Sequence, residues 1–301
     1  MTARGRAAGD RPAVPPAAAL LTAVLAISFA GPLVRFTDAP ALAVAAWRLT
    51  LSVLFVGAVL AVRRTPRPRL SRREWGLAVA GGCFLAGHFW SWIASLDMTT
   101  ISSSVVLVSS QPVFVAVLSG VFLGEAATRR QWLGILVAVA GAAIIAWGDF
   151  GRGREAIIGD VLALGGALFV AIYYVIGRRL RPSVDLWWYI FIIYGVAATV
   201  LLAAVIVLPG VPLTGYATQD WIVFVALAAG PMMLGHTAVN YALRYVRSYI
   251  ANLVLLTEPI TATIIAWLLP AIAEVPGPQV VFGGAVILLG IALTLSAPEQ
   301  P

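Results

Sequence analysis

Long apolar runs recur along the chain and constrain its fold more than any other feature. Each has about 18 to 23 residues, and a helix of about 20 apolar residues crosses the roughly 30 Å hydrocarbon core of a bilayer. Only 11% of the 301 residues are charged, whereas a soluble domain carries about a quarter. We therefore expect an all-α integral membrane protein with ten transmembrane helices, at about 16–35, 40–62, 75–96, 101–123, 131–147, 159–177, 187–208, 220–242, 249–271 and 279–296.

One pattern occurs twice: SQPVFVAVLSGVFLGE at residues 110–125 and TEPITATIIAWLLPAIAE at residues 257–274. Each copy has a proline, Pro112 or Pro259, that stands 16 residues after a leucine and precedes two glycines spaced by seven. A pattern that occurs twice in this way indicates internal duplication. We expect a first five-helix repeat at 16–148 and a second at 149–296. Because each repeat has an odd number of helices, the second is inverted, as in many transporters.

The arginines predict the orientation in the membrane. The net charge is +7, and all 20 basic residues are arginine. If the N-terminus is cytoplasmic and the spans alternate, sixteen arginines fall in cytoplasmic segments and three, Arg35, Arg152 and Arg154, in external ones. This is a strong positive-inside bias. We expect a disordered cytoplasmic tail at 1–15, a cytoplasmic tail at 297–301, and arginines that contact anionic lipid headgroups rather than nucleic acid.

Ionisable side chains within the apolar runs mark a candidate site. Exposure of either Arg48 or Glu258 to lipid would cost several kcal/mol of free energy, so both are expected to face the protein interior or water. His88 and His236 lie on related helices of the two repeats, and a neutral histidine can bind a substrate or carry a proton. The structural alternatives are an ion pair, an Arg48 that reaches the interface, and histidines that tie two helices together.

Neighbouring polar and aromatic residues extend the candidate site. Helical spacing places Trp92 on the face of His88, and Asn240 on the face of His236. Gln111 and Glu258 precede the two prolines, whose expected helix kinks would leave polar groups along a cavity wall. The remaining members of the expected lining are Ser110, beside the first kink, and the deep aromatic Tyr173. Two histidines without a third ligand make no metal site, and we expect no cofactor.

Several segments resemble a known family. Trp47–Arg48, QPVFVAVLSGVFLGE, QWLGILVAVAGAAII, YALRYVRSYIANLVLLTEPITATIIA and GGAVILLGI are similar to the drug/metabolite transporter superfamily, and in particular to its EamA-type exporters. The resemblance covers about 16–296 and departs at Glu125, because Glu274 stands two residues out of register. It implies ten helices in two inverted repeats. It also implies export of small metabolites, often amino acids and including aromatic ones, from a bacterial inner membrane.

These features lead to a functional expectation. We expect a monomeric secondary transporter, not an enzyme, that exports neutral or aromatic amino acids or similar metabolites by alternating access. Glu258 would meet an ammonium group, and Arg48 or a helix N-terminus would meet a carboxylate. One alternative is an exporter of cationic or lipophilic drugs, which deep aromatics and Glu258 would also suit. A remote alternative is an intramembrane enzyme, which would require a nucleophile paired with a base.

Overall fold

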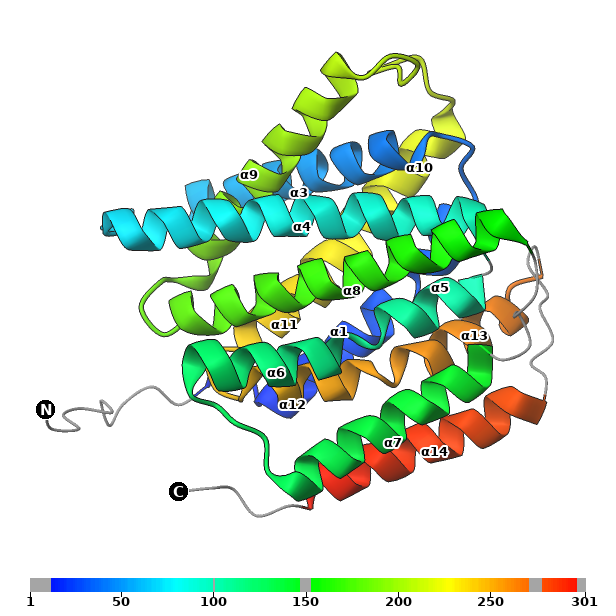
Figure 1. The fold of residues 1–301 in the computed structure, drawn as a ribbon. Coiled ribbons are helices and arrows are strands. Elements are labelled where there is room, and N and C mark those ends of the chain that lie inside the picture. The colour runs from blue at the N-terminus through cyan, green and yellow to red at the C-terminus, as the bar shows by residue number, and fades with distance from the viewer. Residues whose placement is uncertain (1–11, 100, 147–152, 271–277, 297–301) are drawn as a thin grey trace, which may run out of the picture.

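The structure, a computed structural model, describes residues 12–99, 101–146, 153–270 and 278–296, and every regular element in these ranges is helical (Figure 1). The tail at 297–301, most of the tail at 1–15 and the expected boundary at 148–149 lie outside the described residues. The elements are α1 (Pro16–Ile27), α2 (Ala30–Val34), α3 (Ala41–Arg63), α4 (Arg72–Met98), α5 (Ile101–Val108), α6 (Gln111–Leu123), α7 (Arg129–Ala146), α8 (Arg154–Leu180), α9 (Leu186–Val207), α10 (Thr218–Leu227), η2 (Ala228–His236), α11 (Thr237–Ala242), α12 (Ser248–Leu255), α13 (Glu258–Leu268) and α14 (Pro278–Leu295).

Several of these helices, alone or joined end to end, are long and apolar enough to cross a bilayer. Among the described residues seven segments qualify: Pro16–Val34, Ala41–Arg63, Arg72–Met98, Arg154–Leu180, Leu186–Val207, Thr218–Ala242 and Ser248–Ile265. Gln111–Leu123 and Val281–Leu295 are shorter apolar helices. Two of the expected spans end at residues 147 and 271, which lie outside the described residues. A chain with this many apolar segments is a multi-pass membrane protein.

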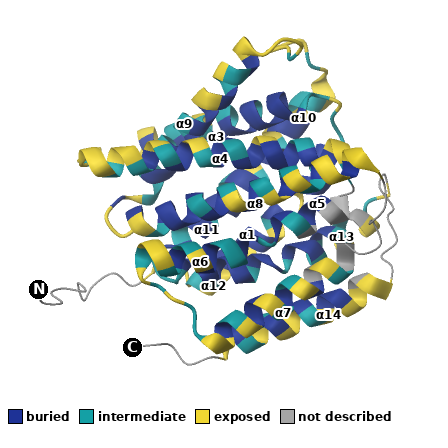
Figure 2. Ribbon diagram, in the orientation of Figure 1, coloured by how far each residue is buried: buried dark blue, intermediate teal, exposed yellow. Residues whose placement is uncertain are grey.

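Exposed residues are spread over the helices of the bundle (Figure 2), and many of them are large and apolar. Leu54, Val121 and Ile206, from three different helices, are 62%, 70% and 72% exposed. In water so much exposed apolar surface would drive association, whereas lipid tails cover it at no such cost. Polar groups such as Arg48 and Asn240 are instead fully buried inside the bundle. The bundle is therefore apolar outside and polar in parts of its interior, as a membrane solvent requires.

Successive long segments run in alternating directions, so the connections gather at two ends of the bundle (Figure 1). Side-chain contacts join several connections at one end. Nε of Arg178 donates to Oε1 of Glu125 at 2.8 Å, and Nη1 of Arg178 donates to the carbonyl of Leu243 at 2.8 Å. At the same end Nε1 of Trp188 donates to the carbonyl of Thr65 at 3.0 Å. We name it the arginine-rich end, because its connections and adjoining turns hold the arginines of 63–73, 129–130, 178–181 and 244–247.

Each proline stretch contains a break between two helices rather than a kink within one. Residues 109–110 separate α5 from α6, and residues 256–257 separate α12 from α13. Pro112 and Pro259 are each the second residue of the new helix. A proline is tolerated there because the first N–H groups of a helix have no partner within it. Both breaks expose backbone and side-chain polar groups between the ends of the bundle, where a site can form.

The paired glycines bring α7 and α14 into backbone contact. A Cβ atom at Gly134 would lie 2.6 Å from the carbonyl oxygen of Gly290, and one at Gly141 would lie 2.7 Å from that of Gly283. The first glycine of one helix thus faces the second of the other, so the two helices are antiparallel. Small residues at such a contact allow close packing where lipid provides no hydrophobic driving force.

Candidate functional site

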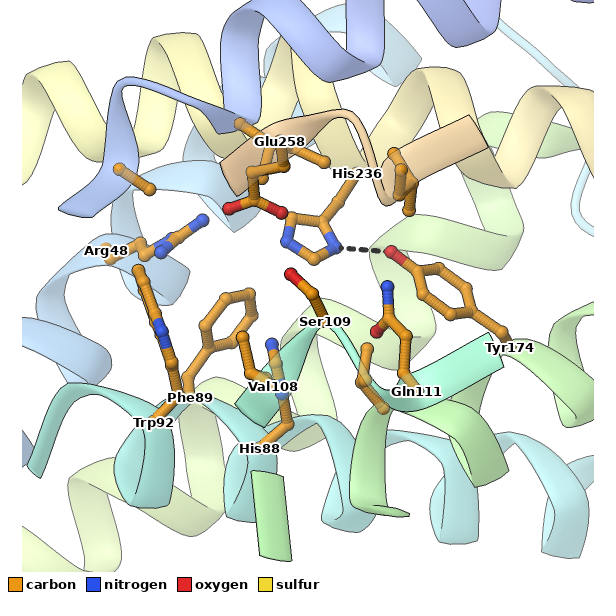
Figure 3. Close-up of a pocket in the computed structure, with 14 residues that line it drawn as sticks. Arg48, His88, Phe89, Trp92, Val108, Ser109, Gln111, Tyr174, His236 and Glu258 are labelled. Atoms are coloured by element: carbon orange, nitrogen blue, oxygen red, sulfur yellow. Dashed lines mark hydrogen bonds between the residues drawn. The ribbon is translucent and has the colours of Figure 1, made fainter. Parts of the chain in front are cut away.

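A small cavity lies beside the two helix breaks, in the interior of the bundle (Figure 3). Its volume of about 30 Å³ holds one or two water molecules. Its wall combines charged, hydrogen-bonding and apolar side chains from both halves of the sequence. The lining residues are Ile27, Ala30, Arg48, His88, Phe89, Trp92, Val108, Ser109, Gln111, Val170, Tyr174, His236, Leu255 and Glu258.

Arg48 supplies the positive charge of the cavity. It extends from α3, is 0% exposed, and holds its guanidinium carbon 4.1 Å from the centroid of the Phe89 ring. The face of an aromatic ring attracts a cation, which fixes the guanidinium in place. Nε and Nη1 are buried and form no hydrogen bond within the described residues. A buried cation with free donors is costly, so this group is well suited to a ligand that supplies acceptors.

Glu258 supplies the negative charge. It is the first residue of α13 and is 9% exposed. Its carboxylate lies between Arg48 and His236 in the view of Figure 3, and it attracts the Arg48 guanidinium electrostatically. The N-terminal end of a helix carries a partial positive charge that favours a carboxylate. The lining of the cavity therefore contains one cationic and one anionic side chain.

The two histidines lie on opposite sides of the cavity, with ring centroids 6.1 Å apart. Nδ1 of His88 is 3.0 Å from the carbonyl oxygen of Gly166. Because a carbonyl only accepts, Nδ1 carries the proton, and Nε2 of the neutral ring remains an acceptor. Nδ1 of His236, at the end of the π-helical segment η2, lies 3.1 Å from the Tyr174 hydroxyl (Figure 3). The described residues contain no group of three or more histidine, cysteine, aspartate or glutamate side chains that could hold a metal ion.

Two further polar groups in the lining make no hydrogen bond to described residues: Nε1 of Trp92 and Oγ of Ser109. Trp92 stands one helical turn after His88 on α4, with the two rings nearly parallel at 8°. Ser109 occupies the break between α5 and α6, and its hydroxyl points into the cavity (Figure 3). Gln111, the first residue of α6, lies beside Tyr174 in the same view. The α5–α6 break thus delivers two polar side chains to the site.

The residues predicted from the sequence divide into two groups. Those that line the cavity are Arg48, His88, Trp92, Gln111, His236 and Glu258. Ser110, Tyr173 and Asn240 lie outside the lining. Oγ of Ser110 donates to the carbonyl of Leu107 at 2.6 Å. Nδ2 of Asn240 donates to the Tyr173 hydroxyl and, at 2.8 Å, to the carbonyl of His236, so this pair ties α11 to α8.

Sequence reasoning missed Ser109, Tyr174 and Phe89. The first two are direct neighbours of the predicted Ser110 and Tyr173. One residue turns a helix by about 100°, so the choice between neighbours depends on the rotation of each helix about its axis. Phe89 has no polar side-chain atom. Its contribution, the stacking of its ring against the Arg48 guanidinium, depends on the tertiary structure. No local signal in the sequence identifies it.

The chain is similar to proteins named as transporters. The "Uncharacterized transporter YdfC" of Bacillus subtilis (strain 168) is 28% identical over 218 residues, which cover 70% of this chain and 68% of that protein. An "Uncharacterized transporter" of Archaeoglobus fulgidus is 26% identical over 252 residues, covering 81% and 86%. The human "Solute carrier family 35 member F6" is 32% identical over 104 residues, covering 32% of this chain and 28% of the human protein. The human match therefore concerns a limited part of each chain.

A solved crystal structure has the same fold, with a TM-score of 0.73, 20% sequence identity, and coverage of 92% of this chain and 95% of the other. Identity this low is evidence of the fold alone. The family model of EamA-like transporters matches residues 15–147 and 157–296, nearly the whole chain. The protein is therefore a multi-pass membrane transporter that belongs to the EamA-like transporter family.

Proposed function

We propose that this transporter exports a neutral or aromatic amino acid, or a similar small zwitterion, across the bacterial inner membrane by alternating access. The supporting observation is that buried Arg48 and buried Glu258 both line one small cavity. A zwitterion brings a carboxylate to the first and an ammonium to the second, forming strong charge-assisted hydrogen bonds. A singly charged ligand leaves one buried charge without a partner, which is unfavourable.

The rest of the lining suits an uncharged side chain. Phe89, Trp92, Val108, Val170 and Leu255 contribute aromatic and aliphatic surface. The cavity of about 30 Å³ is far smaller than pockets that hold small ligands, which measure roughly 300–1,000 Å³. Substrate entry therefore requires helices to separate. Alternating access provides that separation at one end of the bundle at a time.

The proposed architecture is ten crossings in two inverted halves, 16–148 and 149–296, acting as a monomer with both termini in the cytoplasm. Three observations support the arrangement in two inverted halves. The family model matches the chain twice, the two proline stretches break in the same way, and the glycine pairs of α7 and α14 meet in antiparallel fashion. The positive-inside bias favours a cytoplasmic position for the arginine-rich end.

A second candidate is export of cationic or lipophilic drugs. Glu258, with Trp92 and Phe89, favours it, because a carboxylate beside aromatic rings attracts a cation. Arg48 opposes it, because a second cation in the same small cavity is repelled. An enzymatic reaction at this cavity is not proposed, since the family and the named relatives are transporters.

Purified protein in liposomes tests the proposal. Vesicles are loaded with labelled phenylalanine, threonine or other neutral amino acids, and efflux is measured with and without protein and with and without a pH gradient. We expect protein-dependent efflux of at least one neutral amino acid. Efflux equal to that of protein-free vesicles across the panel contradicts amino acid transport, and protein-dependent efflux of a lipophilic cation alone favours the second candidate.

A further inference from the structure

The lining of the cavity includes hydrogen-bond donors that lack acceptors. Nε and Nη1 of Arg48, Nε1 of Trp92 and Oγ of Ser109 are all buried without a hydrogen-bond partner in the described part of the chain. They belong to three separate elements: α3, α4 and the break between α5 and α6. All three residues line the same cavity. Buried donors in folded proteins are usually satisfied, so several donors without partners in the lining of one cavity need an explanation.

The donors are held in position rather than free to find other partners. Trp92 is 4% exposed and Ser109 is 3% exposed, and the guanidinium of Arg48 rests on the ring of Phe89. Three of the four orphan atoms belong to groups that can only donate: the guanidinium and the indole. A ligand group that binds these donors must therefore carry acceptor atoms. Beside the Arg48 charge, an anionic group is favoured over a neutral one.

We propose that Arg48, Trp92 and Ser109 form a carboxylate-binding subsite, so that every transported substrate presents a carboxylate to these three side chains. The inference rests on the proposed function, because the subsite assigns the carboxylate end of the proposed zwitterion to these residues and its ammonium end to Glu258. A carboxylate offers two oxygens with about four acceptor positions, enough for Arg48, the indole N–H and the serine hydroxyl together. Glu258 in the same lining disfavours a more highly charged anion such as a phosphate, because like charges repel.

Three probes with one skeleton test the subsite: L-phenylalanine, 3-phenylpropionate with only the carboxylate, and phenethylamine with only the ammonium. Each is titrated into the purified full-length protein in detergent while the thermal unfolding midpoint is measured. We expect phenylalanine to raise the midpoint most and phenylpropionate to raise it less, because phenylpropionate leaves Glu258 without a partner. Trp92→Phe and Ser109→Ala should each weaken their binding by about tenfold, the effect of losing one hydrogen bond to a charged group, and leave any phenethylamine response unchanged.

Matched control variants lie close by in the sequence. Trp90→Phe makes the same change on the same helix, but Trp90 is 43% exposed on the outer surface. Ser110→Ala removes the adjacent hydroxyl, which is engaged with the carbonyl of Leu107 and absent from the lining. Both controls should bind the two carboxylate probes as wild type does. Trp92→Phe and Ser109→Ala are conservative changes, and their midpoints without ligand show whether they fold.

The outcomes separate this inference from the transport proposal. The subsite is contradicted if neither carboxylate probe raises the midpoint, if phenethylamine alone does, or if Trp92→Phe and Ser109→Ala bind like their controls. If phenylalanine binds as expected but no neutral amino acid crosses the liposome membrane, the subsite is supported and amino acid transport is contradicted. If transport occurs and these two variants leave the KM unchanged, transport is supported and the subsite is contradicted.

Discussion

At the residue scale, the cavity balances one buried cation against one buried anion. Arg48 is held by Phe89, whereas Glu258 lies at the start of α13, directly after a helix break. The two therefore differ in how they respond to movement. Separation of α12 from α13 would carry Glu258 with it and leave Arg48 in place. The charge that is proposed to meet the ligand's ammonium thus lies on a helix that begins directly after a break.

Glu258→Gln should weaken zwitterion transport without unfolding the protein. The amide keeps the shape of the side chain but removes the negative charge. A hydrogen bond to a charged group contributes about 1.5–3 kcal/mol, so we expect the KM for a neutral amino acid to rise about 10- to 150-fold. Uptake kinetics in proteoliposomes measure this. Glu155→Gln, an exposed change at the start of α8, is the control, and an unchanged KM for Glu258→Gln would contradict the role of Glu258.

The sequence predicts the chemistry of the site better than its exact members. Arg48 and Glu258 can be found because a charge within an apolar run is expensive and must face inward. Ser109 and Tyr174 cannot be chosen over Ser110 and Tyr173, because the apolar runs lack the one-sided polarity that would fix helix rotation. In water the polar face of a helix reveals its orientation, but a helix between lipid and a packed core is apolar nearly all round.

At the element scale, the contact between α7 and α14 depends on glycine. A Cβ at Gly134 meets the backbone of α14, which cannot rotate away as a side chain can. The same holds for Gly290, where a Cβ would lie 2.4 Å from the backbone nitrogen of Ala138. Gly134 and Gly290, one from each of the two predicted glycine pairs, are therefore packing residues.

Gly134→Ala should destabilise the protein by about 1–3 kcal/mol, the usual cost of inserting a methyl group into a packed contact. A lower thermal unfolding midpoint in detergent is the readout. Gly165→Ala on α8 is the matched control, because a Cβ there meets nothing within 4 Å. Equal midpoints for the two variants would show that the helices can separate at little cost.

The positions of the helices follow from the apolar runs, but their interruptions do not. The proline at 112 or 259 indicates a disturbed helix, yet a kink and a full break share the same local signal. Which one forms depends on neighbouring helices that satisfy the freed backbone groups. The π-helical segment η2 likewise has only Pro231 as a local signal, and its shifted register brings His236 to Tyr174. These details depend on tertiary contacts that one segment does not encode.

At the scale of the whole molecule, polar contacts join the two halves of the sequence at the arginine-rich end. Arg178 bonds Glu125 and the carbonyl of Leu243. Nearby, the hydroxyls of Ser119 and Ser248 lie 2.7 Å apart, in a contact between α6 and α12. These contacts hold α6, α8 and α12 together on the side of the cavity that faces the arginine-rich end. The geometry fits a closed arginine-rich end, which must open once in each transport cycle if access alternates.

Glu125→Gln should loosen this end. The change removes the charge that pairs with Arg178, so the open state becomes more populated. The reporter is Val108→Cys in the cavity lining, in a background where the single natural cysteine is replaced by Cys83→Ser. Labelling by a membrane-impermeant maleimide applied from the arginine-rich side should become several-fold faster, roughly the effect of 1 kcal/mol. Arg179→Gln, an exposed neighbour, should not change the rate, and equal rates for both variants would contradict the closure.

Counterflow of labelled phenylalanine tests most directly whether a zwitterion held between Arg48 and Glu258 crosses the membrane. Proteoliposomes loaded with millimolar unlabelled phenylalanine are diluted into tracer, and uptake is followed with time. Wild-type vesicles should transiently accumulate tracer above its equilibrium level, while vesicles with the folded double variant Arg48→Gln and Glu258→Gln should match protein-free vesicles. Equal counterflow in wild type and double variant would contradict transport of a zwitterion held between Arg48 and Glu258.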